Sequence, residues 1–258
     1  MIDEGKMFQE ERIIRMVEYI KQKGRATVEE LSEEFHVSPV TVRRDLILIE
    51  RRFDIRRTHG GAMSLITENS EFAFEEKYRQ NISLKKRIAE KAIDYIKDKT
   101  VISFDGGSTN YFIARELDKF SQLKIITNSI PISYLLKDSN HDLIIAGGNI
   151  RKKSMSVVGP LVNDFIEKFN IDVCFIGATG ISPDGSLYSP NELEAATKQV
   201  FLKSSVFKIL VADHTKISMR SFAKFGNVND FDLFITTKEI NSEDLDKLQK
   251  IKNNLVVV

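Results

Sequence analysis

The sequence lacks the features of a secreted or membrane protein. Its 258 residues include one cysteine, Cys174, which excludes an internal disulfide and agrees with a reducing cytoplasm. No apolar run approaches the roughly 20 residues that span a bilayer. The polar, acidic start MIDEGKMFQEER also lacks the basic-then-apolar order of a secretory signal. We therefore expect a soluble cytoplasmic protein with no membrane partner.

Strong net charge and the common catalytic motifs are also missing. The formal net charge is +1, so the overall composition does not indicate a nucleic-acid partner. The chain has no GxxxxGK[ST] loop, no HExxH and no cysteine–histidine ligand set, so we expect no catalytic residues, no metal and no cofactor. Its length fits one small and one medium domain.

The arginines are unevenly distributed along the chain. Residues 38–62 contain six arginines and three acidic residues, whereas residues 28–37 contain four glutamates and no lysine or arginine. A local basic patch of this kind is typical of a small DNA-binding module inside a larger protein, although a solvated charged face would have the same composition.

Helical periodicity predicts three short helices near the N-terminus. The first ends near Gly24, and residues 25–27 form an extended link to the second. Ser38 and Pro39 then supply an N-cap residue and a proline at the first helical position, which start a third helix over residues 39–51. The buried faces that we expect consist of Ile13, Val17 and Ile20, of Val28, Leu31 and Phe35, and of Val42, Leu46 and Ile49.

The short turn before the third helix has the length found in a helix-turn-helix. The outward face of this helix suits the major groove, because arginine binds guanine bidentately and small apolar or threonine groups contact thymine methyls. The DNA-binding residues expected on this face are Val40, Thr41, Arg43, Arg44, Ile47 and Arg51.

Residues 53–62 are expected to form a small hairpin, or wing, around a turn at Gly60 and Gly61. Arg56 and Arg57 would contact the DNA backbone or minor groove from this hairpin. His59 is either a turn residue with a local hydrogen bond or a further DNA contact.

The run GRATVEELSEEFHVSPVTVRRDLILIE, followed by IRRTHGGA, resembles the N-terminal signature of the DeoR family of bacterial repressors. The resemblance implies that Ser38 starts the recognition helix and that the R-x-H-G-G-A segment forms the wing. Where the family usually has a glycine and an apolar residue, this chain has Arg52-Phe53-Asp54, so the helix cannot end in a glycine cap. Residues 1–62 are thus expected to form a winged helix-turn-helix domain, mainly α-helical.

Residues 63–82 are expected to connect this domain to a second one over residues 83–258. The connection contains Phe72, Phe74 and Tyr78, so it should pack on another part of the protein or on a partner subunit. A helix begins near Ser83, and seven apolar runs then alternate with amphipathic segments, which indicates an α/β domain with a mainly parallel sheet. The expected strands are 101–104, 124–127, 143–146, 173–176, 209–212, 233–236 and 255–258. Cys174 should be a buried, inert thiol.

Five of these strands end in small, amide, hydroxyl or charged residues. Ligands of such sheets bind at the carboxyl ends of strands, so these ends should form a polar cup, consisting of residues 105–109, 128–129, 147–151, 177–180 and 213–216. The first segment, DGGST, offers turned backbone N–H groups, hydroxyls and a helix N-terminus, which suit phosphate, although such a turn can also simply begin a helix.

The segments DGGST, TNS, AGGNIRKKS, VGP, IGATGI, NELEAATK and ADHTK resemble, in this order, the C-terminal effector domain of DeoR-type repressors. That domain is similar to ribose-5-phosphate isomerase and coenzyme A transferases. The resemblance implies a phosphorylated sugar or polyol bound by Asp105, Gly106, Gly107, Ser108, Thr109, Asn128, Gly147, Gly148, Arg151, Glu194, Lys198, Asp213 and Lys216.

Together these features predict a repressor of a sugar or polyol operon that binds operator DNA as a homo-oligomer, dimeric or tetrameric, and is released by a phosphorylated sugar. The alternative is a sugar-phosphate isomerase-like enzyme with a DNA-binding appendage. Related isomerases have an acidic residue where this chain has Thr179, and a K-G-G-G segment that it lacks, which favours binding without turnover. Asp105 and Asp213 would be the bases under that alternative.

Overall fold

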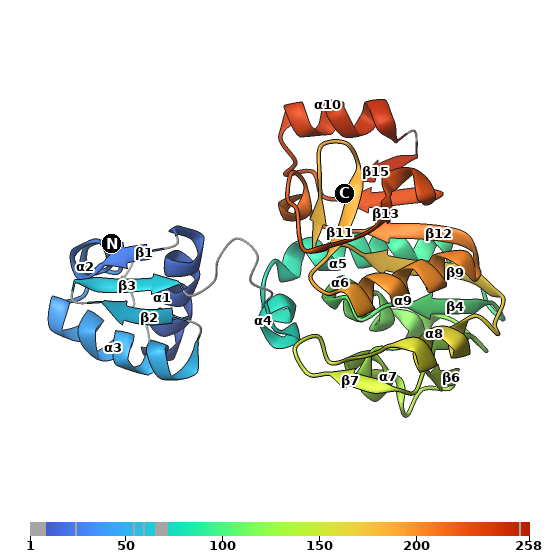
Figure 1. Ribbon diagram of the computed structural model, residues 1–258, viewed down its shortest axis with the longest axis horizontal. Coiled ribbons are helices and arrows are strands. Elements are labelled where there is room, and N and C mark those ends of the chain that lie inside the picture. Colours follow the sequence, from blue (N-terminus) through green and yellow to red (C-terminus); the bar gives the residue numbers. More distant parts are fainter. Residues whose placement is uncertain (1–8, 24, 54, 59, 65–71, 253) are drawn as a thin grey trace. The chain divides into compact units, whose positions relative to one another are not determined.

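A computed structural model of the protein describes residues 9–23, 25–53, 55–58, 60–64, 72–252 and 254–258. The chain divides into two compact units, Met1–Ser70 and Glu71–Val258 (Figure 1). Within the described part of the chain, none of the helices combines the length and the apolar character needed to cross a membrane.

The first unit is a winged helix-turn-helix, as predicted. Its helices are α1 (Gln9–Lys23), α2 (Val28–Glu34) and α3 (Pro39–Arg52). Its strands are β1 (Arg25–Thr27), β2 (Ile55–Thr58) and β3 (Gly61–Ser64), which pair antiparallel in the order β1-β3-β2. The extended link expected over residues 25–27 is therefore a strand of the wing sheet.

Side-chain caps start both helices of the helix-turn-helix. Thr27 and Glu30 form a capping box at α2, and the Ser38 hydroxyl accepts a hydrogen bond from the Thr41 backbone N–H (3.2 Å) at α3. The α3 stripe Val42, Leu46 and Ile49 is at most 1% exposed, as the periodicity predicts. At the far end of α3, Phe53 is extended (φ −135°, ψ 158°), so the helix stops without a glycine cap.

The turn of the wing lies one residue earlier than the sequence suggests. The arms are residues 55–58 and 61–64, so Gly60 is in the turn and Gly61 begins β3. A Cβ atom on Gly61 would lie 2.1 Å from the Ala26 carbonyl oxygen. Glycine is required at this position because β1 runs directly against it.

The second unit contains a seven-stranded parallel sheet in the order β15-β14-β12-β9-β4-β5-β6. All seven predicted apolar runs are strands of this sheet, which confirms the α/β prediction. The strands are β4 (Val101–Phe104), β5 (Lys124–Thr127), β6 (Asp142–Ile145), β9 (Ile171–Gly177), β12 (Ser205–Val211), β14 (Leu233–Thr236) and β15 (Leu255–Val257).

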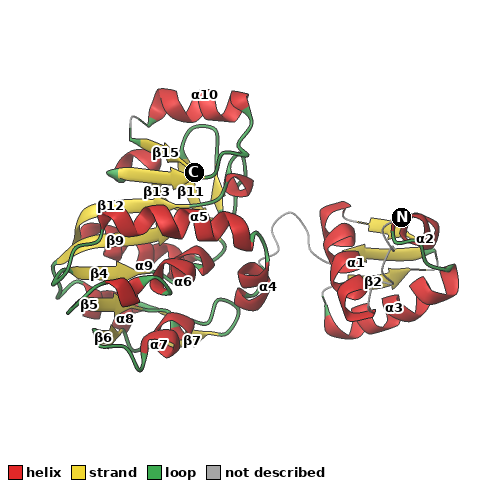
Figure 2. Ribbon diagram, turned by 180° about the vertical axis from the view of Figure 1, so that it is seen from behind, coloured by secondary structure: helices red, strands yellow, loops and turns green. Residues whose placement is uncertain are grey.

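Helices cover both faces of this sheet (Figure 2). One face packs against α5 (Ile82–Ala92), α6 (Ser108–Ala114) and α7 (Ile130–Leu136), and the other against α8 (Pro160–Ile166), α9 (Glu192–Lys203) and α10 (Ser242–Ile251). From β4 the chain continues to β5 and β6, and the connecting helices α6 and α7 lie on one face of the sheet. From β9 it continues in the opposite direction to β12, β14 and β15, and the helices α9 and α10 lie on the other face. The topological switch point lies between β4 and β9, where such sheets bind ligands.

The remaining elements were not predicted from the sequence. They are the helix α4 (Phe74–Arg79), the hairpin of β7 (Asn149–Arg151) and β8 (Ser156–Val158), and a small sheet of β10 (Gly180–Ile181), β11 (Ser186–Ser189) and β13 (Ala223–Asn227). Short 3-10 helices are η1 (Ile93–Tyr95), η2 (Leu117–Lys119), η3 (His214–Lys216) and η4 (Val228–Asp230). The helix expected from Ser83 begins at Ile82 and ends at Ala92, before η1.

The stretch 63–82, interpreted from the sequence as a connection, has several structural parts. Met63 and Ser64 belong to β3, and residues 65–71 lie outside the described part of the chain. Helix α4 belongs to the second unit, where Phe74 and Tyr78 pack against Tyr111. Phe74 and Tyr78, two of the aromatic residues of this stretch, thus pack within the same chain.

Candidate functional site

The outward face of α3 combines exposed arginines with exposed apolar side chains. Val40 and Ile47 are 58% and 38% exposed, and Arg43 and Arg44 are exposed beside them. Thr41 is half-buried because its hydroxyl hydrogen-bonds to the Ser38 hydroxyl (2.9 Å) at the start of the helix. Val40, Arg43, Arg44 and Ile47, four of the predicted DNA-binding residues, are therefore accessible on α3.

Of the two acidic residues of α3, Asp45 and Glu50, only Asp45 is buried. Asp45 is completely buried and accepts hydrogen bonds from Arg12 Nε (2.7 Å) and Gln9 Nε2 (3.0 Å) of α1. A carboxylate that would repel DNA phosphate is thereby neutralised inside the unit, whereas Glu50 remains exposed on α3. The sequence shows Asp45 as one of three acidic residues in the basic stretch, but it does not reveal this pairing.

The wing arginines are exposed on β2, but they occupy successive positions of the strand. Successive strand side chains point to opposite faces, so Arg56 and Arg57 cannot both lie on the same face of the wing. The Arg57 backbone N–H donates to Glu50 Oε1 (2.9 Å), which ties β2 to the end of α3. His59 and the side chain of Arg51 lie outside the described residues.

In the second unit, Asp105 lies at the switch point and is 2% exposed. Its Oδ1 accepts hydrogen bonds from the Gly107 N–H (2.8 Å) and Asn110 Nδ2 (2.5 Å). Its Oδ2 accepts from the Gly177 N–H (3.2 Å) and forms an ion pair with Lys198 of α9. The Asp105 carboxylate thus joins the ends of β4 and β9 to α9, and its lone pairs are directed to the protein.

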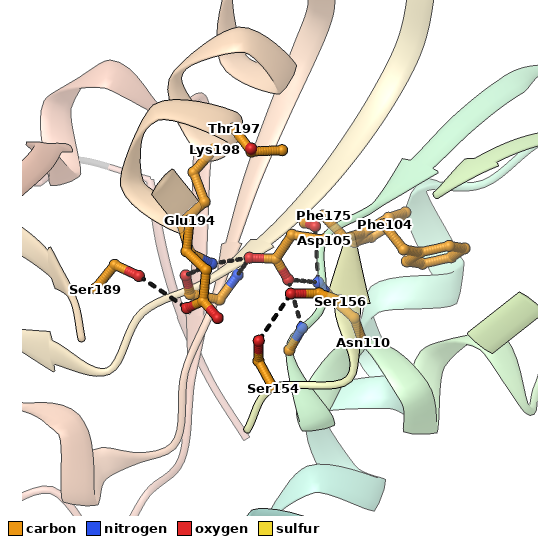
Figure 3. A network of polar contacts seen from close by, with 12 residues as sticks. Phe104, Asp105, Asn110, Ser154, Ser156, Phe175, Ser189, Glu194, Thr197 and Lys198 are labelled. Atoms are coloured by element: carbon orange, nitrogen blue, oxygen red, sulfur yellow. Dashed lines mark hydrogen bonds and ion pairs between the residues drawn. The ribbon is translucent and has the colours of Figure 1, made fainter. Parts of the chain in front are cut away.

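A second ion pair extends this network across the cup (Figure 3). Arg151 at the end of β7 pairs with Glu194 of α9 (Nη1–Oε1 3.1 Å), and Glu194 Oε2 also accepts a hydrogen bond from the Ser189 hydroxyl (3.2 Å). Ser154 and Ser156 of the β7–β8 hairpin hydrogen-bond to each other (2.8 Å). The predicted residues Asp105, Arg151, Glu194 and Lys198 therefore belong to one assembly, together with Asn110 and three serines that the sequence analysis did not single out.

Several polar groups at this site have no hydrogen-bond partner among the residues that the structure describes. Ser108 and Thr109 are buried in the first turn of α6, which no side chain caps. The Oδ1 atoms of Asn110 and Asn128 are buried without a hydrogen bond to any described residue. Because buried polar atoms are normally satisfied, these groups are available to a ligand or to water.

The other predicted effector residues make different contacts. Gly148 has φ +153° and packs against Val157 and Val162, while Gly147 faces open space. Asp213 Oδ1 accepts hydrogen bonds from the backbone and hydroxyl of Thr215, beside the half-buried Lys216. Among the described residues, no hydrogen bond joins these four predicted positions to the Asp105 network.

Two family models match the chain. The DeoR C-terminal sensor domain matches residues 80–238, and the DeoR-like helix-turn-helix domain matches residues 12–68. The transcriptional regulator GlpR of Haloferax volcanii is 32% identical over 243 residues, which cover 94% of this chain and 95% of that protein. The glycerol-3-phosphate regulon repressor of Escherichia coli is 32% identical over 231 residues, covering 89% and 91%. The lactose phosphotransferase system repressor of Staphylococcus aureus is 32% identical over 256 residues, covering 98% and 100%.

Solved structures similar to part of the chain include a ribose 5-phosphate isomerase from Plasmodium falciparum, with 21% identity, 52% coverage of each chain and a TM-score of 0.39. A 4-hydroxybutyrate CoA-transferase from Porphyromonas gingivalis has 16% identity, covers 60% of this chain and 46% of its own, and has a TM-score of 0.40. These are the two protein classes named by the sequence resemblance, and at these scores the likeness does not bear on activity.

Proposed function

The chain belongs to the DeoR family of transcriptional regulators, and from this premise we propose that it represses an operon of sugar or polyol metabolism until a phosphorylated sugar or polyol releases it from DNA. A member of this family is a regulator and not an enzyme, so the isomerase alternative is set aside. Two relatives are named as repressors of a glycerol-3-phosphate regulon and of a lactose phosphotransferase system, which supports the metabolic assignment.

The exposed face of α3 carries the DNA-binding half of the proposal. With Asp45 neutralised inside the unit, Arg43 and Arg44 stand beside Val40 and Ile47 on a helix that Ser38 caps at its start. Arginine for guanine and apolar groups for thymine methyls are the contacts that read a major groove. We propose that two or more copies, in the cytoplasm, present such helices at matched half-sites.

The effector-binding half of the proposal rests on polar groups of the cup that have no partner among the described residues. The first turn of α6 offers backbone N–H groups and two hydroxyls to an anion, and the buried Oδ1 atoms of Asn110 and Asn128 accept hydrogen bonds from ligand hydroxyls. Within the described part of the chain, the Lys216 ammonium forms no hydrogen bond or ion pair, so it would add positive charge. An anionic ligand rich in hydroxyls, such as a sugar phosphate, matches this set.

A two-step binding experiment tests the proposal. A duplex selected by the full-length protein from a random pool is titrated first, and Arg44→Ala should weaken its binding about tenfold or more, since a bidentate base contact contributes about 1–3 kcal/mol. Arg15→Ala is the matched control, because Arg15 is an exposed arginine of α1 that pairs with Glu11. Equal losses in both variants would contradict base recognition by α3.

A thermal-shift panel follows, with glycerol 3-phosphate, ribose 5-phosphate, glucose 6-phosphate, galactose 6-phosphate and the unphosphorylated compounds. We expect one phosphorylated compound to stabilise the protein by mass action, about 2.7 kcal/mol at a hundredfold excess over Kd, and to release the duplex. A panel in which no phosphorylated compound stabilises the protein more than its unphosphorylated partner would overturn the sensor proposal.

A further inference from the structure

Helix α4 is the first regular element of the second unit, and it contacts segments from two sides of the polar cup. At its start, the Phe74 N–H donates to the Lys153 carbonyl (2.8 Å), in the β7–β8 turn beside Arg151. Along its length, Tyr78 packs against Tyr111 and Phe112 of α6, with ring centroids 5.3 Å apart in both pairs. The same α6 begins at the buried hydroxyls of the cup.

The C-terminal end of α4 is held by a buried lysine. Lys85 of α5 is 3% exposed, and its ammonium donates to the carbonyls of Lys77 and Gln80, at the end of α4. Burial lowers the pKa of Lys85 to about 8, and the attraction of the Asp213 carboxylate opposes this lowering. Lys85 of α5 thus holds the end of α4 through these two carbonyls.

A second contact joins the same corner to the same strand end. Asn81, between α4 and α5, adopts the left-handed conformation (φ +53°) and donates from Nδ2 to the Thr215 hydroxyl (3.4 Å). Thr215 itself donates to Asp213 Oδ1. Asn81 therefore connects the α4–α5 corner, where Lys85 holds the end of α4, to the segment that contains Asp213 and Lys216.

We propose that Lys85 is a positioning residue that transmits occupancy of the polar cup to α4, and so to the chain that leads toward the DNA-binding unit. This inference rests on the proposed function above. The Lys85 ammonium donates hydrogen bonds to the carbonyls at the end of α4, and the negative charge of Asp213 attracts it. An anion bound beside Lys216 would change that field and the position of the 213–216 segment, and α4 would follow through the Lys85 and Asn81 contacts.

The test measures coupling in the full-length protein with the selected duplex. The probe is the panel compound that stabilises the protein, and glycerol 3-phosphate is the first to be used. In the wild type the probe should raise the duplex Kd by a factor typical of allosteric coupling, about 5–150. Lys85→Met should bind the duplex alone and the probe alone within about threefold of wild type, while that factor falls below about 2. Lys85→Arg, which keeps the charge and donors, should recover part of it.

Lys252→Met is the matched control. Lys252 is 7% exposed and its ammonium donates to the Phe231 carbonyl, so this variant removes an equally buried lysine that does not contact α4. It should retain wild-type coupling; if it loses coupling as Lys85→Met does, the effect is a general loss of stability and the inference is wrong.

If Lys85→Met does not fold, Asn81→Gly provides the test of coupling through the α4–α5 corner. Glycine tolerates the left-handed conformation, so this variant removes only the hydrogen bond to Thr215, and its coupling factor should also fall. Wild-type coupling in both Lys85→Met and Asn81→Gly would overturn the role of this corner. A wild-type protein in which no probe affects duplex binding would instead overturn the proposed function itself.

Discussion

At Asp105 and Lys198, two residues expected to touch the effector, the structure shows side chains that bind each other. The Asp105 carboxylate accepts hydrogen bonds from two backbone N–H groups and Asn110, in addition to the Lys198 ammonium. A buried charge is stable only when it is paired and hydrogen-bonded in this way. These two residues therefore shape the loop that precedes α6, whereas the amide oxygens of Asn110 and Asn128, which have no hydrogen-bond partner among the described residues, are the groups that we propose for ligand binding.

Cys174 offers a prediction at the residue scale. Its side chain is completely buried in β9, and burial raises the pKa of the thiol to about 12. At pH 8 the folded protein should therefore show almost no reaction with a thiol reagent such as dithionitrobenzoate, whereas protein unfolded in guanidinium chloride should react with one equivalent. Rapid stoichiometric labelling of the native protein would contradict the buried position.

Because the pKa of Cys174 is raised in the folded state, the free energy of unfolding depends on pH in the alkaline range. The folded state keeps its thiol proton at pH values where the unfolded state, near its ordinary value of 9, has lost it. The contribution of this group to the free energy of unfolding is thus fully present below pH 9 and is lost as the pH rises toward 12.

At the scale of elements, the wing sheet depends on a strand that the sequence presents as a link. Residues 25–27 have no alternating pattern of their own, yet β1 pairs with β3 along its whole length. The close approach of the two backbones at Gly61 makes this pairing possible, because no side chain separates them.

The two neighbouring glycines of the wing give a matched pair of substitutions. Gly61→Ala should lower the free energy of unfolding of the first unit by about 1–3 kcal/mol, since the new methyl group would overlap the Ala26 carbonyl and the Thr27 backbone. Gly60→Ala should change it little, because nothing lies within 4 Å of the added Cβ. Urea denaturation of each variant, followed by circular dichroism, measures both values, and equal losses would refute this account of β1.

At the scale of the whole molecule, the polar cup depends on the order of the strands. The Asp105–Lys198 and Arg151–Glu194 pairs join residues 93 and 43 positions apart. They meet because β9 pairs with β4, although the two strands are far apart in the sequence. Helix α9, which follows β9, lies on the opposite face of the sheet from α6. Side chains from separate parts of the sequence therefore gather at one switch point.

A whole-molecule prediction follows from linkage between the two proposed binding events. If a sugar phosphate weakens duplex binding by a given factor, the duplex must weaken sugar-phosphate binding by the same factor. Calorimetric titration of the probe into free protein and into the protein–duplex complex measures that factor independently. Operator DNA that leaves probe affinity unchanged, while the probe releases the DNA, would show that the two ligands do not act through one equilibrium.

The sequence by itself determined the features that depend on local chemistry. The cap at Ser38, the 3.6-residue stripe of α3 and seven apolar runs are set by neighbouring residues, so the winged helix-turn-helix and the parallel sheet could both be predicted. The residues of DGGST could likewise be assigned to the cup, because strand ends of such a sheet lie on one edge. Glu194 and Lys198 of NELEAATK, which lie on a helix, were assigned to it only through the resemblance to the family.

Only the tertiary structure decided what those residues do there. Whether Asp105 faces a ligand or Lys198, whether Asp45 lies exposed or pairs with Arg12, and whether Lys85 is a surface lysine or a buried clamp on α4 depend on partners distant in sequence. A periodic pattern specifies which face of an element is buried, but it does not specify the neighbour against which that face packs. The burial and pairing of charged groups are set by that neighbour, and so the structure alone could show them.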